Sequence, residues 1–498
     1  MFQKYVLDPI LSTFTKFKGR NSFLIGETFY TYNDLIQYVS KIRCEIRRRH
    51  NRSKNIGLVA NDDIETYSAI IAIWLEGYAY VPVHPRYPEE RSAEVFKQAG
   101  VELVADSLGE NTYKDFYVVN TGKLEPSILD IAPKGVSDSE LAYILFTSGS
   151  TGSPKGVPIT RGNLGSFMKS FWEVGFKIDE NDRCLQCFDL TFDVSVQSFL
   201  VPLSKGACIY TIPHGQIKPG YAYTLMDEHK LTFGAMAPSM IRFLRPYFDE
   251  IKLPNIKYNI LTAEASPLGL LEEWSRCVPN AEIYDFYGPT EATIYCTYYK
   301  FDRAGNNKHL NGMISIGRPL NGVRAIITDE EGFRLPNGKK GELCISGPQI
   351  TPGYWNNIEK NVTAFLDKEI EGKSVRFYRT GDLCYFDPDG DIMYSGRLDF
   401  QVKIQGFRVE LGEIEHHARE YLKGSDVVAI AFRNSSGNDA IALFVEKPSI
   451  KTEGLSDYLK SKIPYYMIPS RIVEKDTFPL NSNGKTDRNL LRKSIENM

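Results

Sequence analysis

The sequence has no apolar run long enough to cross a membrane, and its first residues lack a charged stretch followed by an apolar core. These absences predict a protein with no membrane span and no secretory signal, which we expect in the cytoplasm. The eight cysteines are scattered, and the one CxxC, formed by Cys184 and Cys187, has no second pair with which to bind zinc. We interpret the cysteines as ordinary strand or core positions in a reducing compartment.

The sequence also lacks a dominant charge. Its 59 lysines and arginines nearly balance 62 aspartates and glutamates, for a formal net charge of −3. This balance argues against nucleic acid as the main partner. One basic cluster at residues 43–52 includes the run from Arg47 to Arg49, and we interpret it as the solvated face of a helix.

The length and texture of the chain predict more than one domain. At 498 residues the chain exceeds the usual single-domain range. Helix-like and strand-like spacings alternate in residues 64–83, 225–236 and 270–284. This alternation predicts an α/β body of several subdomains, with mixed or parallel sheets flanked by helices. After about Arg318 the pattern changes to short strands and turns.

A bend near the C-terminal fifth of the chain gives the expected domain boundary. Residues 400–411 alternate apolar and polar side chains on both sides of Gly406, which predicts two strands joined by a bend and followed by a helix. We therefore divide the chain into a large body, residues 1–398, and a small α+β lid, residues 399–498.

The most informative segment is residues 141–156. Its apolar part predicts a buried strand, which opens into the loop TSGSTGSPKG. Small hydroxyl residues and glycines leave backbone N–H groups unshielded, so these groups can converge on a phosphate. The segment is not the GxxxxGK[ST] loop, because Lys155 lies between Pro154 and Gly156. An ordinary Gly/Ser turn is the alternative. The candidate phosphate ligands are Thr147, Ser148, Gly149, Ser150, Thr151, Gly152 and Lys155.

This loop and the segments 285–293, 378–383 and 481–488 resemble, in identity and order, the motifs of the adenylate-forming superfamily. That superfamily includes amino-acid adenylation domains, acyl- and aryl-CoA ligases and luciferases. The resemblance extends from Tyr30 to Arg488. It implies that ATP and Mg²⁺ are the cofactors and that a carboxylate is activated by transfer of AMP.

For the segment 285–293 the resemblance implies nucleotide contacts from Asp285, Phe286, Tyr287, Gly288, Pro289 and Thr290. Tyr287 offers a flat face to adenine, and Thr290 offers a hydroxyl to the α-phosphate. Glu291 is the implied Mg²⁺ ligand and a catalytic residue, since magnesium prefers few carboxylates together with phosphate oxygens. Asp285 stands where carrier-dependent relatives often have Asn, and its carboxylate can still accept from the adenine amino group.

The remaining nucleotide residues lie toward the C-terminus. The resemblance implies that Asp382 accepts hydrogen bonds from the ribose, with Tyr394 and Arg397 nearby, and that Asp399 is the hinge of the lid. Lys485 resembles the catalytic lysine, whose charge would stabilise the α-phosphorus in the transition state. An exposed lysine in a polar loop is usually only solvated; the complete motif around Lys485 favours the catalytic role.

The segment FDVSV at residues 192–196 resembles the motif that holds a substrate ammonium group through Asp193. A buried carboxylate needs a cationic partner, which an amino acid supplies. Asp189, in a second Phe-Asp pair, is the alternative. Only Asp193 is followed by a Ser-Val pair, residues 195–196, at the spacing of the family motif. Bulky Phe286 and Tyr295 suggest a small or modest substrate side chain. The implied pocket consists of Val194, Gln197, Ala235, Leu261, Ala263, Phe286, Ile294 and Tyr295.

Residues 396–415 and 463–469 resemble carrier-dependent enzymes, in particular D-alanine–D-alanyl carrier protein ligases and peptide-synthetase adenylation domains. His84 departs from these relatives, which usually have Asp there. The sequence contains no phosphopantetheine motif such as GGxS, so a phosphopantetheinylated carrier protein, if the enzyme uses one, is expected in trans. We also expect a monomer. The expected reaction forms an aminoacyl adenylate and transfers the aminoacyl group to the carrier thiol. The alternatives are an acyl- or aryl-CoA ligase and a non-catalytic nucleotide-binding relative.

Overall fold

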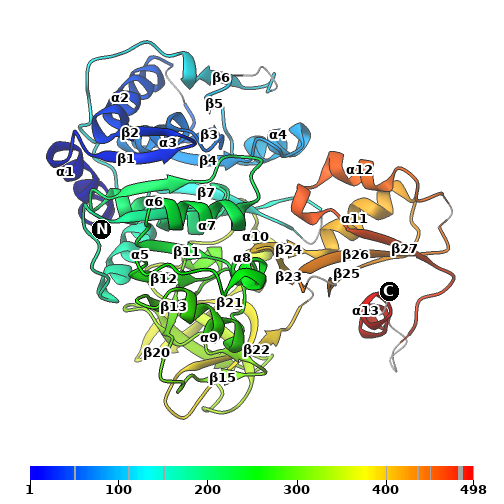
Figure 1. Ribbon diagram of the computed structural model, residues 1–498. Coiled ribbons are helices and arrows are strands. Elements are labelled where there is room, and N and C mark those ends of the chain that lie inside the picture. Colours follow the sequence, from blue (N-terminus) through cyan, green and yellow to red (C-terminus); the bar gives the residue numbers. More distant parts are fainter. Residues whose placement is uncertain are drawn as a thin grey trace. The chain divides into compact units, whose positions relative to one another are not determined.

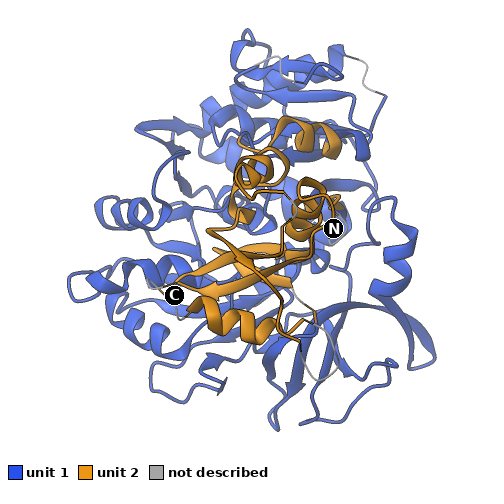
Figure 2. Cartoon of the chain, turned by 90° about the vertical axis from the view of Figure 1, so that its right-hand side faces the viewer, with its two compact units in different colours: residues 1–85, 96–145, 156–398 blue, residues 86–95, 146–155, 399–498 orange. Residues whose placement is uncertain are grey.

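The computed structural model describes residues 1–49, 52–109, 113–149, 152–399, 401–434, 437–448, 450–480 and 486–496. The chain forms two compact units, shown in different colours in Figure 2. Unit 1 comprises Met1–Pro85, Phe96–Leu145 and Gly156–Leu398. Unit 2 comprises Arg86–Val95, Phe146–Lys155 and Asp399–Met498. The C-terminal residues therefore form one unit together with the candidate phosphate loop and a short segment at residues 86–95.

Unit 1 contains two large sheets with parallel centres (Figure 1). In the first sheet every strand pairing with a defined register is parallel. Its six strands, in spatial order, are β6 (Tyr117–Asn120), β5 (Leu103–Asp106), β3 (Asn55–Val59), β4 (Ala79–Val83), β7 (Leu141–Thr147) and β8 (Lys155–Thr160). The expected buried strand before the phosphate loop is thus β7.

The second sheet has nine strands. In order they are β17 (Arg318–Pro319), β14 (Thr297–Lys300), β13 (Glu282–Tyr287), β12 (Tyr258–Leu261), β11 (Phe233–Met236), β9 (Arg183–Gln186), β10 (Cys208–Thr211), β1 (Asn21–Ile25) and β2 (Thr28–Thr31). Its six central strands, β13, β12, β11, β9, β10 and β1, are parallel, and the edge strands β17, β14 and β2 pair antiparallel. Apart from α3 (Ile64–Leu75) and α6 (Asp193–Leu203), the α-helices of the unit are α1 (Asp8–Lys16), α2 (Tyr32–Arg48), α5 (Arg161–Glu173), α7 (Lys218–Glu228), α8 (Pro238–Leu244), α9 (Leu268–Cys277) and α10 (Ile358–Ala364).

Two buried helices, α3 (Ile64–Leu75) and α6 (Asp193–Leu203), pack between these sheets. Every residue of α6 is buried, and so is all of α3 except Glu65. A helix that is apolar on all faces must be covered on all faces, which explains why the two pack against each other. Phe199 of α6 lies 5.9 Å, between ring centroids, from Tyr67 of α3. This packing fixes the N-terminus of α6, where Asp193 is located.

The short strands and turns predicted after Arg318 form an antiparallel sheet. Its strands are β18 (Arg324–Thr328), β19 (Gly341–Ser346), β21 (Lys373–Phe386) and β20 (Phe365–Ile370), with β22 (Ile392–Arg397) also paired to β21. A short hairpin, β15 (His309–Leu310) and β16 (Met313–Ile314), precedes it.

Unit 2 contains the bend predicted at Gly406. Gly406 has φ of 84° and joins β23 (Gln401–Ile404) to β24 (Phe407–Glu410), and α11 (Leu411–Tyr421) follows at once. A glycine suits this positive φ because it has no Cβ. The other elements are β25 (Val427–Arg433), β26 (Asp439–Glu446), β27 (Arg471–Lys475), α12 (Leu455–Lys462), α13 (Arg488–Glu496) and α4 (Glu89–Gln98), whose last residues belong to unit 1.

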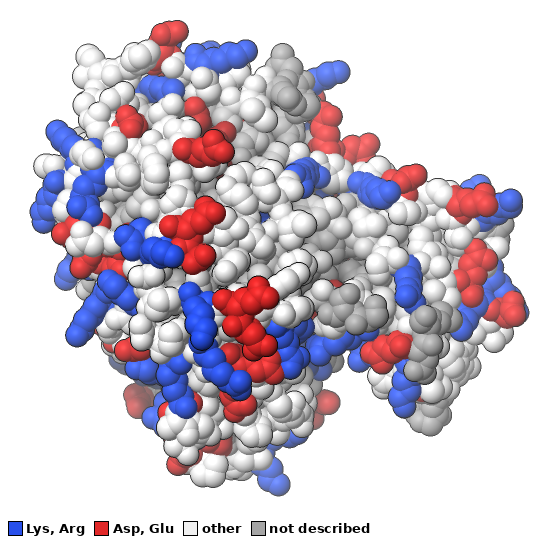
Figure 3. Space-filling view, in the orientation of Figure 1, with Lys and Arg blue, Asp and Glu red and all other residues white. Residues whose placement is uncertain are grey.

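The surface agrees with the balanced charge of the sequence. On the face shown in Figure 3, acidic and basic side chains are interspersed, and neither sign dominates. Among the described residues, no helix is both long and apolar enough to span a bilayer.

The interpretation of the basic cluster was wrong for one residue. Arg43 of α2 has a fully buried side chain and pairs with Glu76, whose Oε1 lies 2.7 Å from Arg43 Nη2. Its guanidinium also donates to the carbonyls of Asp130 and Ala132, at 3.0 and 2.7 Å. Arg43 lies one turn after buried Val39, on the apolar face of the helix. The partner contacts compensate for the desolvation of its charge.

We expect Arg43→Ala to lower the free energy of unfolding by about 1.5–3 kcal/mol, because the buried carbonyls and Glu76 would lose a charged donor. Glu76 would keep Arg47 and Lys134 as partners. Denaturant unfolding followed by circular dichroism measures this change. Arg48→Ala is the matched control: it lies on the same helix with a side chain that is 72% exposed. It should change the unfolding free energy by no more than about 0.5 kcal/mol. Equal effects of the two variants would contradict the burial argument.

Candidate active site

The motif at residues 285–293 comprises the last residues of β13 and the turn after it, at the carboxyl end of the strand, where ligands bind in open α/β sheets. Glu291 is 1% exposed, and its Oε1 accepts a hydrogen bond from the Tyr354 hydroxyl at 2.6 Å. Asp285 is also buried and accepts from the Ser266 hydroxyl. The structure thus gives both acidic residues of the motif a polar partner inside unit 1.

Two neighbouring antiparallel strands, β21 and β22, contribute the predicted ribose residues. In the β21–β22 ladder Asp382 lies opposite Arg397, and Arg397 Nη1 lies 2.8 Å from Asp382 Oδ1. The other oxygen of Asp382 accepts a hydrogen bond from the Tyr287 hydroxyl. Tyr287 and Asp382, which are separated by 95 residues in sequence, are therefore in direct contact. Tyr394 lies on β22 opposite Cys384. Each carboxylate oxygen retains a lone pair for another donor, such as a hydroxyl.

Asp193 is the first residue of α6 and is 6% exposed. Its pKa is raised to about 7, chiefly by burial and also by the charge of Glu291, while hydrogen bonds from the Thr290 hydroxyl and from backbone groups oppose the rise. Within the part of the chain that the structure describes, Asp193 Oδ2 has no hydrogen-bond partner. A buried carboxylate oxygen with no donor is costly, so this atom points to a donor supplied by a ligand.

The backbone beside Asp193 is strained. Thr293 and Ile294 have positive φ values of 56° and 74°, which β-branched residues rarely adopt. Such residues cost about 1–3 kcal/mol each and tend to occur at functional sites. The turn packs on Gly288, where an added Cβ would lie 2.4 Å from the Ile294 carbonyl oxygen. The close approach explains why position 288 requires glycine.

The residues implied for the side-chain pocket are all buried except Ala263, which is half-buried. The rings of Phe286 and Tyr295 lie 4.9 Å apart between centroids. The Tyr295 hydroxyl donates to Gln197 Oε1 at 3.4 Å. The rings of Phe286 and Tyr295 therefore pack together, and the polar atoms among the implied pocket residues include the Tyr295 hydroxyl and the Gln197 amide.

Sequence reasoning missed two tyrosines near Asp193. Tyr80 of β4 and Tyr143 of β7 are fully buried, with ring centroids 5.5 Å apart. Burial raises the pKa of both phenols, and the Asp193 carboxylate raises it further. Neither hydroxyl has a hydrogen-bond partner among the described residues. The sequence signal for these tyrosines was a hydroxyl-bearing side chain inside an otherwise apolar strand, at Tyr80 in β4 and at Tyr143 in β7.

Asp189, the alternative to Asp193, has a cation of its own. Lys218 Nζ lies 2.5 Å from Asp189 Oδ1, and the Asp189 side chain is 5% exposed. A carboxylate already paired with a lysine has less need of an ammonium ligand than Asp193 has.

The candidate phosphate loop has several described contacts within unit 2. The Gly149 N–H donates to Glu413 Oε2 at 3.0 Å, and Arg91 Nη1 lies 2.5 Å from Glu413 Oε1. The Ser148 hydroxyl donates to the Arg408 carbonyl at 3.0 Å and accepts from a backbone N–H. The Glu413 carboxylate thus accepts a hydrogen bond from a backbone N–H of the loop. A phosphate oxygen would make the same kind of contact.

Other predicted residues of the loop and the lid have the following contacts. Lys155 Nζ lies 3.1 Å from Glu410 Oε1, and the Thr147 hydroxyl donates to the Lys155 carbonyl at 3.5 Å. The Asp399 carboxylate accepts from the Gln401 N–H at 3.1 Å. Ser150, Thr151 and Lys485 lie outside the described residues.

Comparison with known proteins identifies the class. Residues 13–355 match the family of AMP-binding enzymes, and the chain belongs to that family. One of the linear gramicidin synthase proteins of Brevibacillus parabrevis is 32% identical over 480 residues, which are 95% of this chain and 9% of that protein. One of the plipastatin synthase proteins of Bacillus subtilis (strain 168) is 29% identical over 480 residues, 95% of this chain and 13% of that protein. The chain therefore spans about a tenth of the length of these curated relatives.

A solved structure has the same fold. The adenylation domain AlmE of Vibrio cholerae, in complex with glycyl-adenosine-5′-phosphate, superimposes with a TM-score of 0.87 at 24% identity, covering 99% of this chain and 97% of that chain. The resemblance to adenylate-forming enzymes and the expected fold class are thus confirmed.

Proposed function

We propose that the protein activates a small amino acid with ATP, forming aminoacyl-AMP and pyrophosphate. It then transfers the aminoacyl group to the phosphopantetheine thiol of a separate carrier protein. The observation that carries this proposal is the Asp193 carboxylate, which is buried and has one oxygen without a donor among the described residues. An α-ammonium group supplies the missing donor and charge.

The nucleotide residues support the first half of the reaction. Tyr287 and Asp382, already in contact, would hold the adenosine part of ATP, and Arg397 would lie beside it. Mg²⁺ fits at buried Glu291, because one carboxylate plus phosphate oxygens is a set that magnesium accepts. When bound, the ion neutralises phosphate charge. Lys485 would add a cation near the α-phosphorus, and Asp399 would be the hinge on which the lid turns.

The pocket supports a small substrate side chain. The rings of Phe286 and Tyr295, 4.9 Å apart between centroids, fill space near Asp193. A large side chain would have to displace these buried rings, which costs packing energy. The structurally similar Vibrio cholerae domain was solved with glycyl-adenosine-5′-phosphate, an adenylate of the smallest amino acid.

Pyrophosphate exchange into ATP tests the activation step. The panel contains L- and D-amino acids, with propionate and benzoate as simple carboxylic acids. Alanine and propionate form the decisive pair, since they differ only by the amino group. We expect exchange with a small amino acid at least tenfold above that with propionate, because only the amino acid can pair with Asp193.

Each other result counts against the proposal. Exchange with propionate or benzoate but with no amino acid would identify an acyl- or aryl-CoA ligase, and CoA would then serve as the acceptor. Absence of exchange with every carboxylate would favour the non-catalytic relative. The transfer step is tested by the mass increase of a phosphopantetheinylated carrier protein, with the unmodified carrier as the control.

A further inference from the structure

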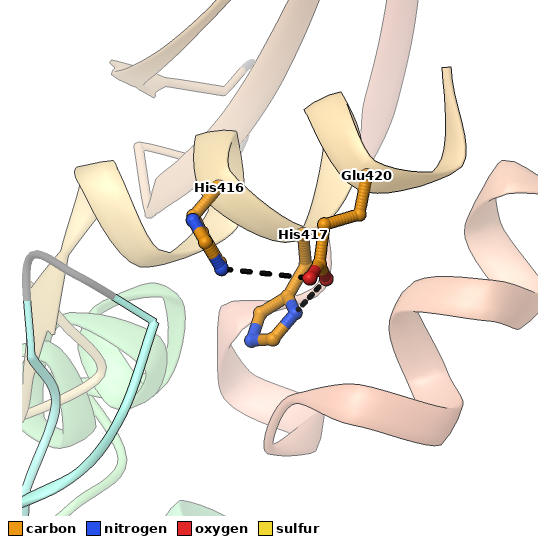
Figure 4. Close-up of side chains that lie close together, drawn as sticks. All are labelled: His416, His417 and Glu420. Carbon is orange, nitrogen blue, oxygen red and sulfur yellow. Dashed lines mark hydrogen bonds and ion pairs between the residues drawn. The ribbon is translucent and has the colours of Figure 1, made fainter. Parts of the chain in front are cut away.

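Three side chains outside the candidate active site gather on α11 of unit 2 (Figure 4). His416 Nε2 lies 3.7 Å from Glu420 Oε1, and His417 Nδ1 lies 3.0 Å from Glu420 Oε2. The two imidazole rings turn toward one carboxylate, and one potential ligand atom from each residue lies within 4.8 Å of the others. Neither the proposed adenylation nor the proposed transfer uses these residues.

The helix itself brings the three side chains together. Glu420 follows His416 by four residues and His417 by three, and side chains at these spacings are neighbours on a helix surface. Ligand atoms bound tetrahedrally at about 2.1 Å from a zinc ion lie roughly 3.4 Å apart. The two imidazole-to-carboxylate separations, 3.0 and 3.7 Å, lie on either side of that value, although they end on different oxygens of Glu420. All three ligand atoms lie within 4.8 Å of one another, so a metal would require side-chain rotations that draw them closer.

We propose that His416, His417 and Glu420 bind a divalent transition metal, with Zn²⁺ or Co²⁺ as the class of ligand. Two imidazoles and one carboxylate form a borderline-soft donor set that suits these ions and does not suit Mg²⁺, which prefers oxygen ligands. The three protein ligands leave a fourth position for water or another ligand.

The surroundings hold the Glu420 carboxylate in place. The Tyr458 hydroxyl of α12 also donates to Glu420 Oε2, at 3.3 Å. A second residue that orients a ligating carboxylate is a common feature of metal sites. The side chain of Glu420 is 49% exposed, so an ion can reach it from solvent.

The site lies beside the phosphate loop within unit 2. A Cβ added at Gly152 would lie 2.4 Å from His416 Cδ2, so the imidazole ring covers this glycine. A bound metal would restrict the rotation of His416 and hold its ring at the loop. The site is thus placed next to the residues proposed to bind phosphate.

The experiment uses the full chain, freed of metal with EDTA and kept without nucleotide. Calorimetric titration with Zn²⁺ measures affinity, and the visible absorption of Co²⁺ reports the coordination. We expect one equivalent of Zn²⁺ to bind, with affinity reduced at least tenfold in His417→Ala and in Glu420→Gln. His309→Ala, at an exposed histidine on β15, is the matched control and should bind as wild type does. Thermal unfolding verifies that each variant is folded.

Two results would overturn the proposal. One is absence of Zn²⁺ binding to the wild-type chain. The other is unchanged affinity in both folded variants, which would place the ion elsewhere. Competition provides a further check: Mg²⁺ at a hundredfold excess should leave Zn²⁺ bound, whereas displacement by Mg²⁺ would indicate an oxygen site and contradict the imidazole ligands.

Discussion

Replacement of Lys485 by alanine should reduce ATP–pyrophosphate exchange by about 100- to 1,000-fold, the usual effect of removing one group that stabilises transition-state charge. The same variant should still transfer an aminoacyl group from supplied aminoacyl-AMP to the carrier thiol. The reason is that the lysine charge is required only while the α-phosphorus is under attack. Exchange and single-turnover transfer, measured on the same preparation, test both halves of this prediction.

Lys460→Ala is the matched control for this experiment. Lys460 is a lysine of the same C-terminal residues, with a side chain that is 60% exposed, and it pairs with Asp457 of its own helix at 2.8 Å. Its replacement should leave both reactions unchanged. Equal loss of exchange and transfer in Lys485→Ala would instead indicate that the lysine supports folding or both chemical steps.

In the proposed mechanism the two steps are separated because the lid, residues 399–498, would carry two motifs that act in turn. Lys485 would serve activation and the Gly406 hairpin would serve transfer. Asp399 would be the hinge between these states. This alternation is part of the proposed mechanism, and the Lys485 variant tests it directly.

Local sequence patterns predicted the elements whose structure depends on nearby residues. The apolar run before the phosphate loop is β7, and the alternation around Gly406 gives β23 and β24. For β7 the signal is a continuous apolar run that ends in a loop of small residues, and for β23 and β24 it is the period of two interrupted by Gly406. The order of the nucleotide motifs also predicted that Tyr287 and Asp382 belong to one site, and the structure places them in contact.

Features that depend on long-range packing could not be predicted in this way. Arg43 looked like part of a solvated arginine cluster, yet its partner Glu76 lies 33 residues away. Glu413 accepts a hydrogen bond from the N–H of Gly149, which is 264 residues away in the sequence. The positive φ of Ile294 contradicts the preference of a β-branched residue, so only its tertiary surroundings impose it.

Replacement of Asp193 by asparagine should lower kcat/KM for the amino acid by about 100-fold or more, since losing one partner of a buried charge pair costs roughly 2–5 kcal/mol. Asp189→Asn, next to the same helix, is the matched control and should lose less than tenfold, because Asp189 pairs with Lys218. Exchange kinetics over a range of amino-acid concentrations measures both variants. Equal activity of Asp193→Asn and wild type would contradict the assignment of the ammonium site.

The pH dependence gives this prediction a second readout. The pKa of Asp193 is raised to about 7, chiefly by burial, so the carboxyl is mainly protonated below that pH. Because the ionised form binds the ammonium group, KM for the amino acid should rise up to tenfold per pH unit below about 7. Asp193→Asn should remove this dependence, since an amide does not titrate in this range.

The same raised pKa predicts a cost in stability with a definite sign. Asp193 ionises near pH 4 in the unfolded chain and near pH 7 in the folded one, so the folded state loses stability as the pH rises between these values. Asp193→Asn should therefore raise the unfolding temperature at pH 8 and have little effect at pH 4. Saturating amino acid should stabilise the wild type at pH 8 and stabilise the variant much less. Together these outcomes would show that the carboxylate is retained for binding at the expense of stability, whereas an equal ligand effect on both proteins would place the ammonium elsewhere.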